Sequence, residues 1–110
     1  MCIGDETTFA EFCFVGGASE VIVGKANSVG QYVSIHPENH LPVRGDGSVK
    51  TTSKGVLIGN DNWIGAKATI LDGSRIDDRS QVAACAVVNM HIPSKVLVAG
   101  IPAKVKKTFE

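Results

Sequence analysis

The sequence predicts an all-β chain that winds as a parallel solenoid of short strands, and three observations support this fold class. From Ile58 onward, a β-branched aliphatic residue recurs every six positions through six successive hits and ends at Val88. The chain has 12 glycines but only 5% aromatic residues, which indicates a narrow interior filled by small aliphatic side chains. Small residues recur at the fifth position of the six-residue units, as a tight bend requires.

The six-residue period matches neither a helix nor one long strand. A helix needs apolar residues about every 3.6 positions, and the polar cluster Asn60–Asn62 interrupts that spacing. A long strand alternates with period two, which the glycine and aspartate placements would break. Short strands with a bend after each one fit the pattern, and three such faces, each formed by one six-residue unit, close one coil. The expected stacked pairs are Ile58 with Ile76, Ile64 with Val82, and Ile70 with Val88.

The N-terminal part follows the same rule with one slip of two residues. Its period runs through Ile3, Phe9, Val15 and Val21, and restarts at Val23, Val29 and Ile35. Between Ile35 and Ile58 the units stop, and the mixture of proline, glycine and charge predicts one extruded loop at about 41–57. We therefore expect a single domain over 1–110, with coils over about 3–40 and 58–90 and a short C-terminal tail over 91–110.

Charge and composition disfavour several classes of protein. Eleven Lys+Arg balance eleven Asp+Glu, so the basic excess typical of nucleic-acid binders is missing. The longest apolar run, Val82–Val88, is too short to cross a membrane, and the N-terminus lacks the features of a signal peptide. Three scattered cysteines form no CxxC pair, so we expect no metal site, no disulfide framework and a reducing cytoplasmic location.

Three segments of the C-terminal half carry a specific motif pattern. They read Ile58-Gly59…Trp63-Ile64-Gly65, His91-Ile92-Pro93 and Ala99-Gly100-Ile101-Pro102-Ala103-Lys104. Together they resemble the hexapeptide-repeat acyltransferases, closest to the branch of maltose and galactoside O-acetyltransferases and xenobiotic acetyltransferases. The resemblance implies a left-handed β-helix and a homotrimer with active sites between subunits. It also implies acetyl transfer from acetyl-CoA to a hydroxyl or amine of a sugar or other small molecule.

The catalytic residue of that family is a histidine that ends a coil just before the extruded loop. His36 stands at the second position of a six-residue unit, where a small residue is usual. His40 stands where the loop departs, and its separation from Trp63 along the chain matches the histidine-to-tryptophan spacing of the sugar-acetylating branch better than that of His36 does. We expect His40 to be the general base and His36 to be a solvent-facing corner residue. Neutral imidazole, with a pKa near 6.5, can accept the proton that an attacking alcohol or amine loses.

The resemblance also implies a coenzyme A groove along the helix axis. The matching positions are Ala66 and Ala84, which stand three six-residue units apart and so on one edge, where small side chains let the pantetheine arm approach the backbone. Trp63 is expected beside the active site. Lys104 and Lys107 match positions that are basic in the family and face the nucleotide phosphates.

One departure from the family concerns the phosphates. A threonine–lysine pair that is common before the D-I-P segment is replaced here by Asn89-Met90, and His91 replaces the aspartate. One phosphate-facing lysine is therefore missing. His91 is expected to be a surface substitution and not a catalyst.

The acceptor site is less clearly marked than the coenzyme site. The chain starts directly in the first coil at Ile3, without the helical segment of the sugar acetyltransferases. Phe9, Phe12 and Phe14 crowd the early coils, where they either line an acceptor pocket or shield the open end of the helix. Glu11 and Phe12 are the acceptor contacts that we expect.

Two alternative functions remain open. A γ-class carbonic anhydrase shares the β-helix but needs three histidines that converge on a metal, and histidines in consecutive units are missing here. A non-catalytic binding or scaffold protein is favoured by the short N-terminus. The presence of His40, Trp63 and the AGIPAK tail in one chain argues against that interpretation.

Overall fold

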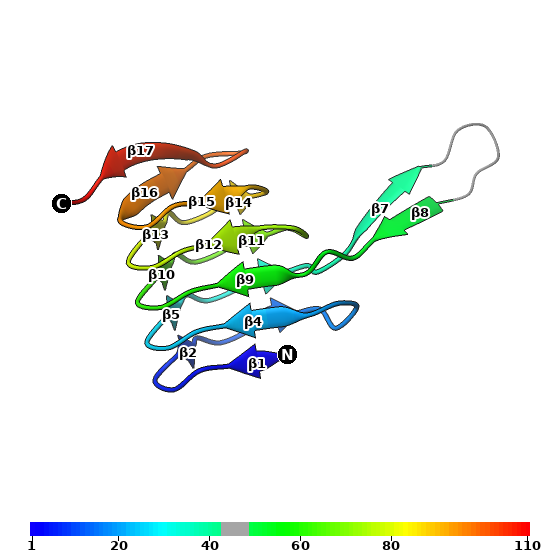
Figure 1. Ribbon diagram of the computed structural model, residues 1–110, viewed down its shortest axis with the longest axis horizontal. Helices are drawn as coiled ribbons and strands as arrows, with labels where there is room; N and C mark the ends of the chain where they lie inside the picture. The colour runs from blue at the N-terminus through cyan, green and yellow to red at the C-terminus, as the bar shows by residue number, and fades with distance from the viewer. Residues whose placement is uncertain (43–48) are drawn as a thin grey trace.

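The computed structural model describes residues 1–42 and 49–110; in the strands over 39–42 and 49–52 it describes the backbone pairing but not the side chains. All regular elements in this part of the chain are β-strands, and no helix within it could cross a membrane. The short strands stack as coils that wind left-handedly from the N-terminus to the C-terminus (Figure 1). The predicted all-β, left-handed parallel β-helix is confirmed.

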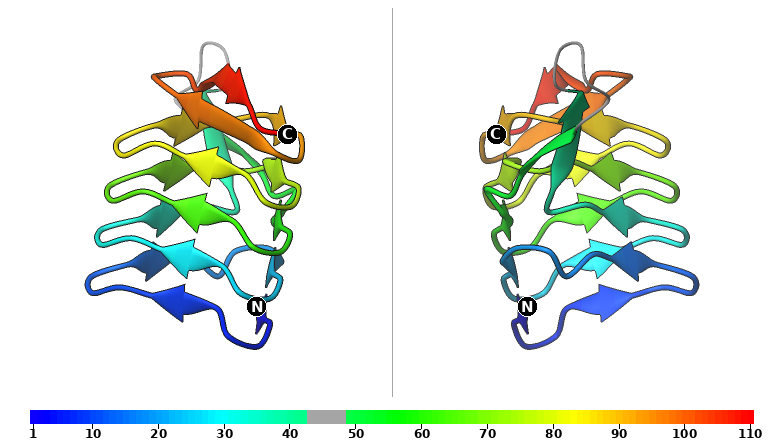
Figure 2. Two further views of the ribbon diagram at one scale, coloured as in Figure 1. Left: turned by 90° about the vertical axis from the view of Figure 1, so that its left-hand side faces the viewer. Right: turned by 90° about the vertical axis from the view of Figure 1, so that its right-hand side faces the viewer.

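Three sheets form the faces of the β-helix, and each coil contributes one strand to each complete face (Figures 1 and 2). Sheet A contains β1 (Cys2–Ile3), β4 (Val21–Val23), β9 (Val56–Ile58), β12 (Arg75–Ile76) and β15 (His91–Ile92). Sheet B contains β2 (Thr8–Phe9), β5 (Ser28–Val29), β10 (Trp63–Ile64), β13 (Gln81–Val82), β16 (Val96–Ala99) and β17 (Lys104–Thr108). Sheet C contains β3 (Phe14–Val15), β6 (Ser34–Ile35), β11 (Thr69–Ile70) and β14 (Val87–Val88). Coils 1 to 5 begin with successive strands of sheet A, and the corners AB, BC and CA are named after the sheets that they join.

The strand register confirms the predicted stacking of the core. Ile58 pairs with Ile76, Ile64 with Val82, and Ile70 with Val88. The two-residue slip in the first coil is also real, because Ile3 pairs with Val23, Phe9 with Val29, and Val15 with Ile35. Most of these aliphatic side chains are buried in one continuous core. Full burial of each such side chain stabilises the fold by about 1.5–3 kcal/mol.

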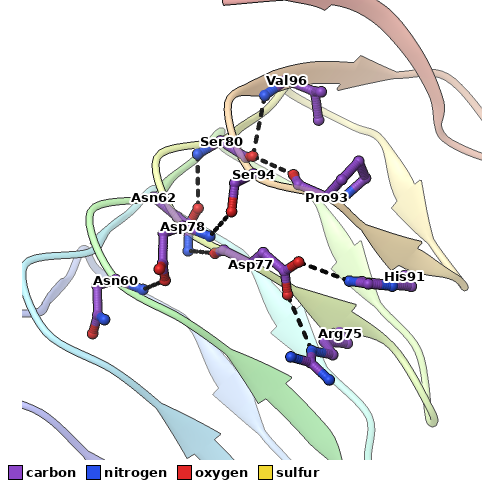
Figure 3. Close-up of polar contacts among 10 residues, drawn as sticks. All are labelled: Asn60, Asn62, Arg75, Asp77, Asp78, Ser80, His91, Pro93, Ser94 and Val96. Carbon is purple, nitrogen blue, oxygen red and sulfur yellow. Dashed lines mark hydrogen bonds and ion pairs between the residues drawn. The ribbon is translucent and has the colours of Figure 1, made fainter.

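Corner AB contains a buried ladder of polar side chains that the sequence pattern did not reveal. The Asn62 N–H donates to Asn27 Oδ1 at 2.9 Å. The Ser80 N–H donates to Asn62 Oδ1 at 2.9 Å (Figure 3). The Val96 N–H continues the ladder to Ser80 Oγ at 3.2 Å. Asn62 and Ser80 occupy the fifth positions that we expected to be small for the bend. Their side chains point inward instead, where they satisfy backbone groups of the next coil.

The bends at corners AB and BC have left-handed backbone at non-glycine residues. Nine residues have φ between 57° and 64°: Glu6, Phe12, Ala26, Tyr32, Asp61, Lys67, Arg79, Cys85 and Lys95. This conformation disfavours an L side chain by about 1–2 kcal/mol, so the coil stack must hold it in place. At several of these bends a glycine stands two residues before the left-handed position. A Cβ on Gly65, for example, would lie 2.7 Å from the Ala84 nitrogen, because the two coils pack backbone against backbone there.

The extruded segment leaves corner CA of coil 2 as an antiparallel hairpin of β7 (Asn39–Pro42) and β8 (Val49–Thr52). The hairpin projects away from the stacked coils (Figures 1 and 2). The chain returns to sheet A with β9, which pairs with β4 from Val56 onward. The last residues of the expected loop over 41–57 therefore already belong to the coil, since Val56 is buried in the core.

The winding also continues beyond residue 90, where we expected the tail to begin. Both β15 and β16 pair in parallel with the preceding coil, and only β17 turns back as an antiparallel strand. Ile92 pairs with Ile76, whereas the unbroken six-residue period would set it opposite Ser74, so corner CA of coil 4 is two residues short. This shortening hid the fifth coil from the sequence pattern.

Candidate functional site

Corner BC brings four positions of successive coils into one column. Backbone bonds define it: the Tyr32 N–H donates to the Glu11 carbonyl at 3.2 Å, the Lys67 N–H to the Gln31 carbonyl at 2.8 Å, and the Cys85 N–H to the Ala66 carbonyl at 3.0 Å. The column therefore consists of Glu11, Gln31, Ala66 and Ala84, one residue from each of coils 1 to 4. Ala66 and Ala84 do lie on one edge, where Ala66 is half-buried and Ala84 is exposed.

Trp63 lies on the outer face of sheet B, immediately before this corner. It pairs with Ser28 on one side and Gln81 on the other, and 54% of its surface is exposed. Because the indole lies outside the core, packing inside a coil does not explain it. An exposed indole between two small or polar neighbours is a flat apolar surface that is available for a ligand.

The lysines of β17 lie on the same sheet as Trp63. Lys107 pairs with Leu97 and Lys104 with Ala99, and these β16 residues are half-buried while both lysines are exposed. The order of sheet B places β17 three strands from the strand of Trp63, a separation of about 14 Å. Lys104 and Lys107 therefore stand at the C-terminal end of the face that carries Trp63.

Aromatic rings gather at the N-terminal end of corner BC. The Phe12 ring stacks on Tyr32 with a centroid distance of 5.2 Å, and 76% of Phe12 is exposed. Beside them Gln31 Nε2 donates to Glu11 Oε2 at 2.6 Å. Because of the two-residue slip of coil 1, Phe12 lies next to Tyr32 and Glu11 next to Gln31 in the coil stack. The slip is visible in the sequence, so Tyr32 and Gln31 could have been predicted as neighbours of the expected acceptor contacts.

An apolar hollow of about 340 Å³ adjoins this aromatic pair at the open end of the first coil. Phe9 and Phe12 line it together with Ile3 and Val15. Phe14 does not belong to it, because its ring packs against His36 at a centroid distance of 5.3 Å. Of the three crowded phenylalanines, two border the hollow, and the third, Phe14, lies on sheet C.

The two candidate histidines have different backbone settings. The His36 N–H donates to the Ile70 carbonyl at 2.8 Å, so His36 remains tied to the coil stack, and its ring is half-buried against Phe14. The backbone of His40 belongs to β7 of the projecting hairpin and pairs with Thr51. The His40 side chain lies outside the described residues. Coil 2 thus carries both Tyr32 at corner BC and the departure of the His40 hairpin at corner CA.

The third histidine takes part in an ion cluster on sheet A. Asp77 accepts from Arg75 Nε at 3.0 Å and contacts His91 Nε2 at 2.9 Å (Figure 3). The hydrogen bond from His91 is the main reason why the pKa of the Asp77 carboxyl lies below its ordinary value, and Arg75 acts in the same direction. The cluster borders a hollow of about 450 Å³ that includes Ile22 and Leu57. This hollow contains none of the site residues expected from the sequence.

Among the residues with described side chains, no three histidine, cysteine or carboxylate groups gather where they could hold a metal ion. His36 closes coil 2 on sheet C, whereas His91 opens coil 5 on sheet A. The three cysteines are free; Cys13 is half-buried, and its thiol donates to the Gly30 carbonyl at 3.1 Å.

Comparison with known proteins identifies the repeat and a set of relatives. Residues 55–89 match the family described as "Bacterial transferase hexapeptide (six repeats)". A chloramphenicol acetyltransferase of Agrobacterium fabrum (strain C58) is 28% identical over 96% of this chain and 54% of its own length. A probable macrolide acetyltransferase of Lysinibacillus sphaericus is 33% identical over 97% of this chain and 63% of its own. The chain spans between half and two thirds of the length of these relatives.

The fold has close counterparts among solved structures. A hexapeptide-repeat containing acetyltransferase from Vibrio cholerae superposes with a TM-score of 0.91 at 29% identity, covering 98% of this chain and 62% of that one. A second structure of the same protein, complexed with acetyl-coenzyme A, gives a TM-score of 0.75 at 25% identity. It covers 99% of this chain and 68% of its own.

Proposed function

We propose that the chain transfers an acetyl group from acetyl-coenzyme A to a hydroxyl or amine of a small molecule, as its similarity to the hexapeptide transferase family over residues 55–89 and to bacterial acetyltransferases supports. One observation carries this proposal: the part of the corner BC column formed by Ala66 and Ala84 runs beside Trp63, on the sheet whose far strand bears the exposed lysines. An extended ligand with a phosphate end and an apolar arm suits such a surface.

The coenzyme lies along corner BC in this proposal. Its phosphates are held by Lys104 and Lys107, since ammonium groups make charge-assisted hydrogen bonds to phosphate. The pantetheine arm then follows the backbone past Ala84 and Ala66, with Trp63 beside it. The small side chains at these positions would let an amide-rich arm approach the backbone and form hydrogen bonds with it.

His40 acts as the general base. It takes the proton of the attacking hydroxyl or amine as the new bond to the thioester carbonyl forms, and the coenzyme A thiolate leaves when the tetrahedral intermediate collapses. General-base help of this kind contributes roughly 10²–10⁴-fold to the rate. Transfer is direct within a ternary complex, and a backbone N–H of a neighbouring coil stabilises the oxyanion.

A homotrimer would complete the site. The His40 hairpin leaves corner CA of coil 2, whereas the coenzyme column lies on corner BC of the same chain. A threefold axis that runs parallel to the axis of the β-helix sets equivalent coils of the three copies at the same level. The hairpin slants from coil 2 toward the C-terminal end of the stack (Figure 1), so in such a trimer it would meet the next copy above the level of Gln31 and Tyr32.

The acceptor would occupy the N-terminal end of corner BC, with Glu11 and Phe12 as contacts. The hollow beside Phe12 is apolar, so we propose that the acceptor carries an apolar group next to the nucleophilic hydroxyl or amine. The similarity to acetyltransferases of chloramphenicol and of macrolides agrees with this class of acceptor.

Release of free thiol from acetyl-CoA tests the function. A panel of alcohols, amines and sugars is offered to the purified protein, and turnover is compared for wild type, His40→Ala and His36→Ala. We expect His40→Ala to lower kcat at least 10²-fold while coenzyme A binding stays nearly unchanged. Loss of activity in His36→Ala but not in His40→Ala would refute the assignment of the base. Tight coenzyme binding without any turnover in wild type would favour the scaffold alternative.

A further inference from the structure

Asp72 is a buried carboxylate that the proposed function leaves unused. Only 8% of its surface is exposed, and it lies at corner CA of coil 3, directly above the point where the extruded hairpin returns. The Lys54 N–H lies 2.9 Å from both Asp72 oxygens, and the Gly55 N–H donates to Asp72 Oδ1 at 2.8 Å. A charged acceptor thus holds two consecutive backbone groups immediately after β8.

The same junction is clamped from the coils on either side. From coil 1, Ser19 Oγ donates to the Ser53 carbonyl at 3.3 Å, and the Glu20 carbonyl accepts from the Val56 N–H at 2.9 Å. From coil 3, the Gly73 N–H donates to the Gly55 carbonyl at 2.8 Å. Residues 53–56 are therefore fixed between two coils before the chain enters sheet A.

Gly55 shows how tightly this junction is built. Its φ of 93° lies in the left-handed region, and an added Cβ would lie 2.8 Å from the Glu20 carbonyl oxygen. A side chain at this position would push the junction off coil 1. The close approach lets Asp72 reach the Lys54 and Gly55 N–H groups together.

We propose that Asp72 is a positioning residue for His40. This inference rests on the proposed function, because it takes His40 as the general base. The His40 backbone pairs with Thr51 across the hairpin, and Thr51 is only three residues before Lys54. The Asp72 hydrogen bonds fix the segment that follows β8. The antiparallel pairing with β8 then fixes β7, and β7 carries His40. Misplacement of a catalytic group by about 1 Å can lower a rate about 10²-fold, so an anchor of this kind sets kcat.

The substitution series separates the contacts. Asp72→Ala removes both oxygens, whereas Asp72→Asn retains one oxygen and sets an amide N–H against the Lys54 N–H. Ser74→Ala is the matched control: Ser74 is also buried, two residues further on, and its hydroxyl donates to the Val88 carbonyl at 3.0 Å and not to the hairpin junction. It tests whether any loss of activity comes from general weakening of the corner.

Hydrogen exchange of the full-length protein tests the anchor without reference to activity. We expect the Lys54 and Gly55 amides, and the amides of β8, to exchange at least 10-fold faster in Asp72→Ala than in wild type or Ser74→Ala. Asp72→Asn should give an intermediate rate, and it replaces the alanine variant if that variant does not fold. Unchanged exchange in both Asp72 variants would overturn the proposal.

Kinetics with the best acceptor from the thiol-release panel test the positioning role. Asp72→Ala should lower kcat by about 10–10²-fold while the Kd of coenzyme A stays within twofold, and Asp72→Asn should lie between it and wild type. Ser74→Ala should retain kcat. Faster exchange with an unchanged kcat would overturn the positioning role. Absence of coenzyme binding in wild type would instead overturn the proposed function, and the exchange result would still stand for the anchor itself.

Discussion

Replacing Asn62 by alanine removes one rung of the hydrogen-bond ladder inside corner AB. The side chain is 2% exposed; its Oδ1 accepts from the Ser80 N–H at 2.9 Å, and its Nδ2 donates to the Asp77 carbonyl at 2.6 Å. An alanine methyl group can replace neither partner. A buried polar group that loses its partner costs about 1–3 kcal/mol, so the two together predict a loss of about 2–6 kcal/mol. That is a large part of the roughly 5–15 kcal/mol by which a domain is stable.

Asn60→Ala is the matched control, because it makes the same change two residues earlier on the same corner. Asn60 is exposed, and its Oδ1 accepts from the Lys25 N–H at 2.8 Å. Water can replace this exposed acceptor, so we expect a loss below about 1 kcal/mol.

Urea unfolding at equilibrium measures both losses, and the slope of the free energy against urea must be the same for all three proteins. The ladder predicts that Asn62→Ala loses at least about 2 kcal/mol more than Asn60→Ala. Equal losses for the two variants would show that the buried ladder does not stabilise the stack, and the reasoning would be refuted.

Three further predictions concern the ligand sites and the surface. Lys104→Ala with Lys107→Ala should weaken coenzyme A binding about 10-fold at low salt and less at high salt, because screening reduces the attraction to phosphate; calorimetry showing equal affinity would remove the phosphate role. Phe12→Leu should raise KM for an aryl glycoside, whose apolar group would contact Phe12, but not for the methyl glycoside of the same sugar. The reverse pattern would show that the hollow beside Phe12 does not bind the apolar group of the acceptor. The depressed pKa of Asp77 stabilises the fold above its ordinary value of 3.8, and this contribution is lost as pH falls through the lower folded-state pKa. Urea midpoints at pH 6 and pH 3 should therefore differ more for wild type than for Asp77→Asn.

The winding could be predicted from the sequence because the core repeats one simple requirement. Each coil needs a β-branched residue at the same three positions, so the pairing of Ile64 with Val82 could be predicted from their spacing in the sequence. The same logic fails where a corner changes length. Corner CA of coil 4 is two residues short, so the period predicts a tail where the coil that contains Ile92 lies.

The site was predicted in part, for a related reason. Ala66 and Ala84 follow the repeat, so their shared edge could be derived by counting. Asp72 could not be derived in this way, because its partners are backbone N–H groups of a segment that breaks the period. To predict the contact between Phe12 and Tyr32, the two additional residues of coil 1 had to be counted. With them, Phe9 pairs with Val29 and Phe12 lies beside Tyr32.

Calorimetric titration of acetyl-CoA into the wild-type protein and two bulky variants tests the coenzyme corner most directly. Ala84→Phe would fill the path of the arm at an exposed position of corner BC, whereas Ser94→Phe adds the same ring at an exposed position of corner AB. We predict saturable binding to wild type and to Ser94→Phe, and loss of binding in Ala84→Phe. Undiminished binding in Ala84→Phe, or no binding to wild type, would contradict the account.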